Sequence, residues 1–291
     1  MRLLAVAIAA LALASPGGSV PPFPQLAKLF AYDAAAPLSV REAGVTTTDG
    51  IAVHDLSYAS PVRGRVPAYL VVPKGDGPFP VVLFAPGSSG TRDGFLGDAQ
   101  ALAARGLAGF LFTPPHIRPD GPLLTTCNAA KDVSTVVQYV KEERRAIDVI
   151  ASRSELDAKR IGYVGFSLGA DFGGILAGVE KRISAYALQS GRAHYSVFPA
   201  TDCATRLPAK RRASYREAMG VVNAVHYVGH AAPAALLVQN GTLDPISPRK
   251  DVLALYNAAS RPKTLRWYRS AHRLPAAATP YRDAWLIAHL R

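Results

Sequence analysis

The stretch Ile161–Gly169, with the sequence IGYVGFSLG, decides the fold. Its first four residues are apolar enough for a buried strand, and an apolar helical pattern begins after Ser167. Gly165, Ser167 and Gly169 have the spacing G-x-S-x-G, which places a serine on a sharp turn between a strand and a helix. Side chains two residues before or after that serine would collide, so glycine is used at both places. The stretch predicts a serine presented at the end of a core strand.

Two further residues fit the chemistry that such a serine needs. A hydroxyl is a weak nucleophile near neutral pH, so a base must take its proton and an acid must orient that base. After this kind of turn the acid comes next along the chain and the histidine comes last. Asp244 follows the predicted strand 235–238, and His272 follows the predicted strand 264–268. Because open α/β sheets gather their sites at the carboxyl ends of strands, the order predicts a triad of Ser167, Asp244 and His272.

Other acidic residues and histidines compete for these two roles. Asp251 and His289 lie inside helical patterns, which indicates structural or solvated positions. Asp202 lies in an irregular segment and is interpreted as a loop residue. Three histidines of the same segment could contact a substrate, although they are poorly placed for the base: His194, His226 and His230.

A glycine- and serine-rich loop, Pro86–Gly90 (PGSSG), follows the apolar strand 80–85. Negative charge develops on the carbonyl oxygen when a serine attacks an acyl group, so N–H donors are needed nearby. The pattern predicts these donors as the backbone N–H groups of Ser88 and Leu168. The alternative is an ordinary flexible turn. A phosphate-binding loop is excluded because no lysine and hydroxyl pair follows the glycines.

Strand-like and helix-like segments alternate along most of the chain. An antiparallel pair is predicted first, at 51–58 and 66–72. Further strands are predicted at 80–85, 107–112, 161–164, 184–188, 235–238 and 264–268. Helices are predicted at 98–105, 128–151, 168–179, 247–258 and 281–290. The alternation predicts an α/β fold with a mostly parallel central sheet, helices on both faces and antiparallel N-terminal strands.

One segment, 192–232, interrupts this alternation. It is long for a connection between strands, and it follows a strand whose end should face the site. We expect it to form a small insert that lines the substrate cleft. The rest of 41–291 is predicted to be one domain, because a chain of this length can bury a large single core. A proline-rich extension, 15–40, precedes it and is expected to lie on the surface.

The first residues have the pattern of a signal peptide. Met1–Arg2 gives one positive charge, Leu3–Ala14 is apolar, and small residues precede the segment Ser15–Gly18. The apolar stretch is shorter than the roughly 20 residues that a membrane-spanning helix needs. We therefore expect residues 1–14 to be cleaved and the mature protein to be secreted. An uncleaved anchor and a buried strand are the alternatives.

The chain has two cysteines, Cys127 and Cys203. An oxidising compartment would allow a disulfide between them to persist, and the alternative is two free buried thiols. Two isolated cysteines lack the ligand spacing of a metal site, and no metal or organic cofactor is expected.

The formal net charge is +12. The basic residues are spread along the chain, with one dense run at Lys210–Arg212, and no nucleic-acid recognition motif accompanies them. We expect a solvated basic surface, with weak attraction to anionic surfaces and no specific nucleic-acid partner.

With these motifs, the chain resembles the dienelactone hydrolase-like branch of the α/β-hydrolases, a branch that also includes secreted serine esterases and acylaminoacyl-peptidase catalytic domains. The likeness is carried by four stretches: Pro80–Gly90, Asp157–Gly169, Gln239–Pro245 and Trp267–His272. It implies an eight-stranded sheet, catalytic roles for the predicted triad, and Ser88 and Leu168 at the oxyanion hole. The chain departs from some relatives in having serine where dienelactone hydrolases have cysteine, and Ala271 where glycine is common.

The predicted function is hydrolysis of carboxylic esters through an acyl-enzyme on Ser167. The expected substrate is a small-molecule or lipid-like ester. The nearest alternative is an amidase or peptidase of the acylaminoacyl-peptidase type. A different class of alternative is a catalytically retired protein that binds a polyanion or a cell wall.

Overall fold

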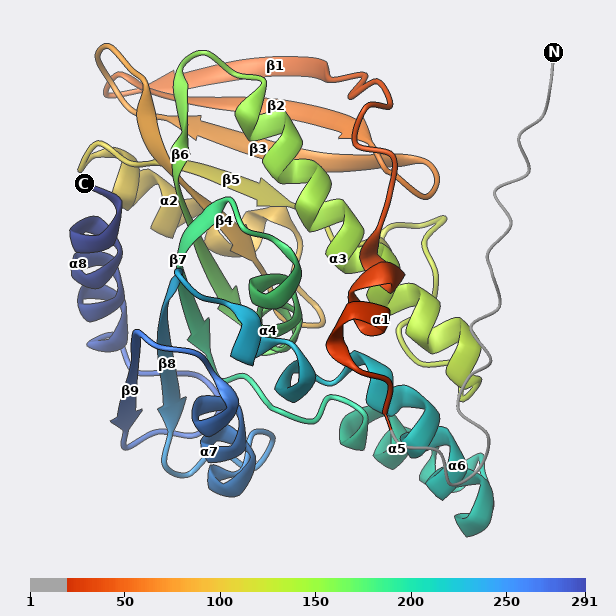
Figure 1. Ribbon diagram of the computed structural model, residues 1–291. Helices are drawn as coiled ribbons and strands as arrows, with labels where there is room; N and C mark the ends of the chain where they lie inside the picture. Colours follow the sequence, from red (N-terminus) through yellow and green to blue (C-terminus); the bar gives the residue numbers. More distant parts are fainter. Residues whose placement is uncertain (1–19) are drawn as a thin grey trace, which may run out of the picture.

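The computed structural model describes residues 20–291, and the predicted signal segment 1–14 lies outside this range. Nine strands form one sheet in the order β1-β2-β3-β5-β4-β6-β7-β8-β9 (Figure 1). The strands are β1 Arg41–Thr48, β2 Ile51–Ala59, β3 Arg65–Val72, β4 Phe79–Ala85, β5 Ala108–Phe112, β6 Leu156–Phe166, β7 Ile183–Gln189, β8 Ala235–Gly241 and β9 Lys263–Tyr268. The pairs from β1 to β5 in this order are antiparallel, and all later neighbours are parallel. The predicted sheet is confirmed, with one strand more than the resemblance implies.

The additional strand is β1, at the open edge of the sheet. All of its residues are exposed, and it pairs only with β2. Because neither of its faces is buried, the segment lacks the alternation of apolar and polar residues by which a strand is recognised.

Helices cover both faces of the sheet, as predicted. They are α1 Phe23–Ala27, α2 Leu96–Ala103, α3 Ala129–Ala151, α4 Leu168–Val179, α5 Val197–Asp202, α6 Ala209–Met219, α7 Arg249–Ala258 and α8 Ala278–Leu290. Helices α3 and α4 cover one face, and α2 and α8 cover the other (Figure 1). Strand β4 shows how the two faces are filled, since Val81 and Leu83 pack on the α3 side whereas Val82 and Phe84 pack on the α8 side.

The N-terminal extension is exposed or half-buried along most of residues 20–40 and inserts two side chains into the core. Helix α1 and the short helix Lys28–Phe30 bring Leu26 and Phe30 into the core, where both are fully buried. The Phe30 ring meets Tyr227 edge to face, with 5.5 Å between ring centroids. These two residues therefore anchor the extension to the hydrophobic core, because they are spaced to point inward from one short helical stretch.

Along the chain, helices α5 and α6 come between β7 and β8, in the segment that interrupts the alternation. In space they lie away from these two strands, near the end of α3 (Figure 1). Helix α6 packs against α3. Across residues 20–291, every helix is too short or too polar to span a bilayer.

Candidate active site

Ser167 lies in the turn between β6 and α4, with φ 53° and ψ −113°. Residues with a side chain rarely adopt this conformation, so the turn is strained. A Cβ atom at Gly165 would lie 2.4 Å from the carbonyl oxygen of Gly169, and one at Gly169 would lie 2.2 Å from that of Ala85. Only glycine fits at these two positions. The predicted strand, sharp turn and helix are therefore present.

The structure brings Ser167, His272 and Asp244 into one hydrogen-bonded chain. His272 Nε2 lies 2.8 Å from Ser167 Oγ, and His272 Nδ1 lies 2.8 Å from Asp244 Oδ2. A carboxylate can only accept, so Nδ1 carries the proton and donates to Asp244. Nε2 is then free of hydrogen and accepts from the Ser167 hydroxyl. This is the tautomer in which a histidine can take a proton from a serine.

Two backbone N–H groups hold the Asp244 carboxylate. Oδ1 of Asp244 accepts from the N–H groups of Ile246 and Ser247, at 2.8 and 3.0 Å. The Asp244 side chain is 0% exposed, whereas that of His272 is 19% exposed. The carboxylate is therefore fixed and shielded from water, while the imidazole remains reachable from the cleft.

Ser190 holds the backbone of His272 in place and was not identified from the sequence. Its hydroxyl donates to the carbonyl oxygen of His272 at 2.7 Å. Its own carbonyl oxygen accepts from the Ser247 hydroxyl at 2.7 Å, which ties the acid loop to the histidine loop. Ser190 comes directly after β7 and has φ 55°. A polar residue at the carboxyl end of a strand was the available sequence signal.

Ser88 and Leu168 lie where the sequence places the oxyanion donors, in the loop after β4 and at the start of α4. In the described part of the chain, neither backbone N–H has an acceptor. The fold therefore leaves both of these N–H donors unused.

His116 holds the Ser88 peptide in place, and the sequence analysis did not identify it. His116 Nε2 lies 2.9 Å from the carbonyl oxygen of Ser88 and must be the donor. Burial lowers the pKa of His116, so its ring is neutral at physiological pH. Its Nδ1 atom is buried without a partner in residues 20–291. His116 lies just after β5 at the same edge of the sheet, which was the only sequence signal for it.

A fully buried carboxyl group lies behind the turn. The Tyr163 hydroxyl lies 2.7 Å from Glu143 Oε1 and 2.6 Å from the carbonyl oxygen of Gly169. Burial raises the pKa of Glu143 well above its ordinary value. Because one hydroxyl proton cannot serve two acceptors, a protonated Glu143 donates to Tyr163, which donates to Gly169. This proton chain supports the peptide of the second glycine of the turn.

A second histidine–aspartate pair lies outside this chain of bonds. His194 Nδ1 lies 2.5 Å from Asp251 Oδ1, and the His194 N–H also donates to Asp251. His289 lies on α8 and bonds the carbonyl oxygen of Trp285, and His230 stacks on Phe23. The structure therefore brings none of these rival residues to Ser167.

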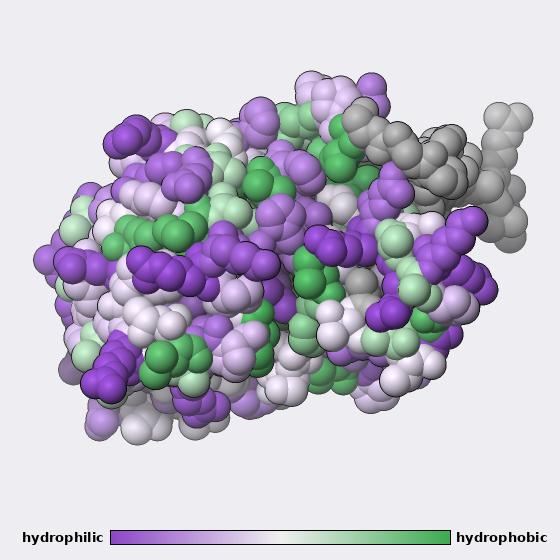
Figure 2. Space-filling model, turned by 90° about the horizontal axis from the view of Figure 1, so that it is seen from below, coloured by the Kyte–Doolittle hydropathy of each residue, from purple (hydrophilic) through white to green (hydrophobic). Residues whose placement is uncertain are grey.

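A cavity of about 410 Å³ is lined by Phe166 and Arg273, the chain neighbours of Ser167 and His272, although none of the three triad side chains lines it. Phe166 forms part of its wall and also contacts His272, with 5.2 Å between the two ring centroids. Gly87, Leu274 and Arg273 line other sides. Figure 2 shows the molecule from below, the side toward which the β7, β8 and β9 arrowheads of Figure 1 point, as a hollowed face with separate hydrophobic patches among hydrophilic residues.

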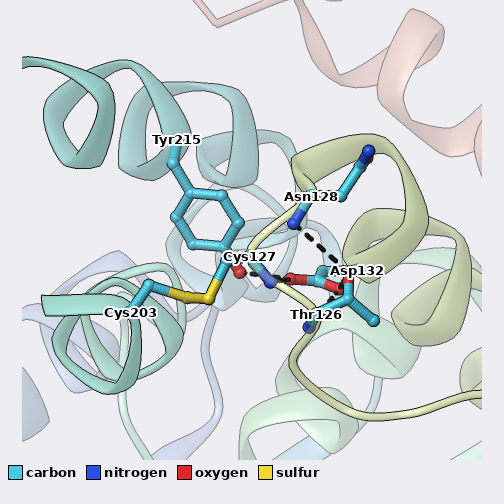
Figure 3. Close-up of a disulfide and its surroundings, with 6 residues drawn as sticks. All are labelled: Thr126, Cys127, Asn128, Asp132, Cys203 and Tyr215. Carbon is cyan, nitrogen blue, oxygen red and sulfur yellow. Dashed lines mark hydrogen bonds between the residues drawn. A yellow bond between two sulfur atoms is a disulfide. The ribbon is translucent and has the colours of Figure 1, made fainter. Parts of the chain in front are cut away.

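A disulfide joins Cys127 to Cys203 and ties the loop before α3 to the segment between β7 and β8 (Figure 3). Asp132 reinforces the link, since its buried carboxylate accepts from the Tyr215 hydroxyl of α6 at 2.6 Å and from the N–H of Cys127 at 3.1 Å. The disulfide that the sequence allowed is confirmed. It covalently fixes the segment that carries α5 and α6.

No cluster of three or more metal-ligating side chains occurs in residues 20–291.

No protein-family profile matches the chain. It is similar to the solved structure of acetyl xylan esterase 1 from Thermoanaerobacterium sp. JW/SL YS485, with a TM-score of 0.80 and 14% identity, over 94% of this chain and 96% of that one. The acetyl xylan esterase from Paenibacillus sp. R4 gives a TM-score of 0.77 and 19% identity, over 93% of this chain and 100% of that one. A glucuronoyl esterase from Solibacter usitatus gives a TM-score of 0.70 and 14% identity, over 96% of both chains. The nine-stranded sheet and these likenesses show that the chain has the α/β-hydrolase fold.

Proposed function

We propose that this protein is a serine hydrolase that cleaves carboxylic esters through an acyl-enzyme on Ser167. One observation carries the proposal: His272 Nε2 lies 2.8 Å from Ser167 Oγ while Nδ1 of the same ring contacts Asp244. A hydroxyl, a base and an orienting carboxylate in this order are what acyl transfer by a serine requires.

In the first half of the reaction, Ser167 Oγ attacks the carbonyl carbon of the ester and its proton passes to His272 Nε2. The electron pair of the carbonyl double bond moves to the oxygen, which the N–H groups of Ser88 and Leu168 stabilise. When the carbonyl re-forms, the bond to the alcohol oxygen breaks and His272 protonates that oxygen. Asp244 stabilises the imidazolium between these two proton transfers.

In the second half, water attacks the acyl-enzyme and gives its proton to His272. The bond between the acyl carbon and Ser167 Oγ breaks, and the proton returns to the serine. The products are an alcohol and a carboxylic acid.

The solved structures named above support esters over amides as substrates, since all three are called esterases. Two of them are called acetyl xylan esterases, so acetyl esters are the first substrates to test. The exposed apolar side chains of Leu243 and Ile246, on either side of Asp244, are compatible with an ester that has an apolar portion.

We further propose that the protein is exported and works as one domain with a cap formed by 192–232. The Cys127–Cys203 disulfide supports an oxidising compartment, where such bonds persist. Weak attraction to anionic surfaces is proposed from the net charge of +12.

The proposed function is tested with Ser167→Ala in an assay of p-nitrophenyl esters from acetate to octanoate. We expect kcat/KM to fall by at least about 10⁴-fold. Ser184→Ala is the matched control, because Ser184 is a hydroxyl at the opposite end of β7 that bonds only a backbone carbonyl oxygen. Retained hydrolysis in Ser167→Ala would refute the assignment, and an aminoacyl anilide cleaved faster than every ester would favour the amidase.

A further inference from the structure

We propose that a second cavity, lined by Arg63, Arg65 and Arg118, binds an oxyanion such as a phosphate, sulfate or carboxylate group. The cavity has a volume of about 390 Å³. It lies between the turn that joins β2 to β3, the loop after β5, and α3, which contributes Gln138. Guanidinium groups suit this ligand because their N–H donors match the geometry of two oxygens on one anion.

Two of the three guanidinium groups are held in fixed orientations. Arg65 donates to Ser57 Oγ and to the carbonyl oxygens of Ser57 and Ser39, at 2.7 to 3.0 Å. Arg118 donates to the carbonyl oxygen of Arg65 at 2.9 Å, and its side chain is only 11% exposed. Groups that are already oriented lose little conformational freedom when a ligand binds.

Each guanidinium keeps donors for a ligand. The hydrogen bonds of Arg65 leave its Nη1 unused, and those of Arg118 leave its Nε unused, within residues 20–291. Arg63 uses only Nη2, which donates to the carbonyl oxygen of Asp120 at 3.2 Å. An anion in the cavity could therefore be bonded without breaking any of these contacts.

The charge around the cavity is positive. Arg65 has only neutral acceptors, and burial, with a smaller contribution from the charge of nearby Arg41, lowers its pKa. The carboxylates that face the arginines are Glu142, which is bonded to Arg118 at 2.7 Å, and Asp120, which lines the cavity. The three arginines that line the cavity, against these two carboxylates, leave one excess positive charge, which a bound anion would neutralise.

The cavity opens at the same edge of the sheet as the triad. Ala68 of β3 is paired with Phe112, the last residue of β5, so the start of β3 lies level with the carboxyl end of β5. Arg118 comes two residues after His116, which holds the Ser88 peptide. An oxyanion at this site would therefore be bound near the active site without touching the reacting atoms. It could come from free phosphate or from an acidic group on a polymer.

The test is a titration of the protein with inorganic phosphate, in which binding is measured by thermal unfolding and by calorimetry. A parallel titration with sodium chloride at matched ionic strength is the control. We expect millimolar phosphate to raise the Tm of the wild type by a few degrees more than chloride does, because a ligand that binds only the folded state stabilises it. Arg63→Gln should weaken the affinity for phosphate about tenfold, which is the loss of one charge-assisted hydrogen bond. Arg63 is the first choice because it is exposed and bonds only one carbonyl oxygen, so the variant should fold.

Arg105→Gln is the matched control, an exposed arginine after α2 that does not line the cavity. It should bind phosphate as the wild type does. Linear polyphosphate in a parallel titration separates the sources of the anion: tighter binding per phosphate group, lost in Arg63→Gln, indicates an anion carried on a polymer. A phosphate effect no larger than that of chloride, or one equal in Arg63→Gln and Arg105→Gln, would overturn the proposal. Ester hydrolysis is not part of the readout, so failure here is distinct from failure of the proposed function.

Discussion

Two histidine–aspartate pairs in this molecule have the same contact between the histidine Nδ1 and a carboxylate, and differ in what the histidine Nε2 contacts. His272 bonds Asp244 through Nδ1 and reaches Ser167 through Nε2. His194 bonds Asp251 through Nδ1, and no hydrogen bond to its Nε2 is formed within residues 20–291. The carboxylate orients both rings in the same way, so orientation alone does not make a catalytic base.

The surroundings of the two carboxylates also differ. Asp244 is fully buried and accepts two loop N–H groups, whereas the side chain of Asp251 is 15% exposed at the start of α7. The His194 side chain is 38% exposed. We infer that the first pair is built for proton transfer and that the second stabilises the segment after β7.

The largest expected difference is between His272→Ala and His194→Ala. Loss of the base should lower kcat/KM for p-nitrophenyl acetate by about 10⁵-fold or more, because the serine then keeps its proton. Loss of His194 should change kcat/KM less than about threefold, since it does not contact the reacting atoms. Initial rates of both purified variants measure this. Equal losses in the two variants would contradict the comparison.

The next difference is between the aspartates. Asp244→Asn should lower kcat by about 10⁴-fold, as in other triads, because an amide favours the wrong tautomer of the histidine. Asp251→Asn should leave kcat within about threefold and lower the free energy of unfolding by about 1 kcal/mol, the value of one hydrogen bond. Steady-state kinetics and urea unfolding of both variants give the two quantities. A larger loss of kcat in Asp251→Asn than in Asp244→Asn would reverse the roles.

A smaller effect is expected at His116, which positions a backbone donor instead of a side chain. His116→Ala should lower kcat about tenfold with little change in KM, less than the loss of an oxyanion donor itself. His116→Gln keeps an N–H donor for the Ser88 carbonyl oxygen and should recover part of the rate. His289→Ala is the control, since His289 also bonds one backbone carbonyl oxygen but lies on α8. A change confined to KM would indicate a binding role instead.

The sequence predicted the parts of the site that have a local signal. The turn around Ser167 is specified by glycine spacing, and Asp244 and His272 by their places after strands. His116, Ser190 and Glu143 were missed because their partners lie far along the chain, and only the folded sheet brings them together.

The sheet itself was predictable where strands are buried and less so at its ends. Strand β6 begins at Leu156, five residues before the predicted strand, because Leu156 pairs with Phe79 at the start of β4. That residue pair is set by tertiary contact, which a single apolar run does not indicate. Strand β1, exposed throughout, has no such run at all.

The last comparison concerns stability instead of rate, and is between two buried carboxyl groups, Asp244 beside the histidine and Glu143 behind the turn. Asp244 is held by N–H donors, whereas Glu143 contacts only the Tyr163 hydroxyl and leaves Oε2 without a partner in residues 20–291. Because burial raises the pKa of Glu143, the folded protein keeps a proton that the unfolded chain releases above about pH 4.3. The free energy of unfolding should therefore fall as pH rises from there toward the folded pKa, by up to about 1.4 kcal/mol per pH unit.

Glu143→Gln removes this dependence, since the amide does not titrate and can still donate to Tyr163. The variant should gain stability relative to the wild type as the pH is raised from 4.5 to 7.5, measured by urea unfolding at each pH. Glu155→Gln is the control, because the Glu155 carboxylate is 33% exposed and paired with Arg153. If Glu143→Gln and the wild type lost stability in parallel over this range, Glu143 would have to be ionised in the fold, and the proton chain from Glu143 through Tyr163 to Gly169 would not exist.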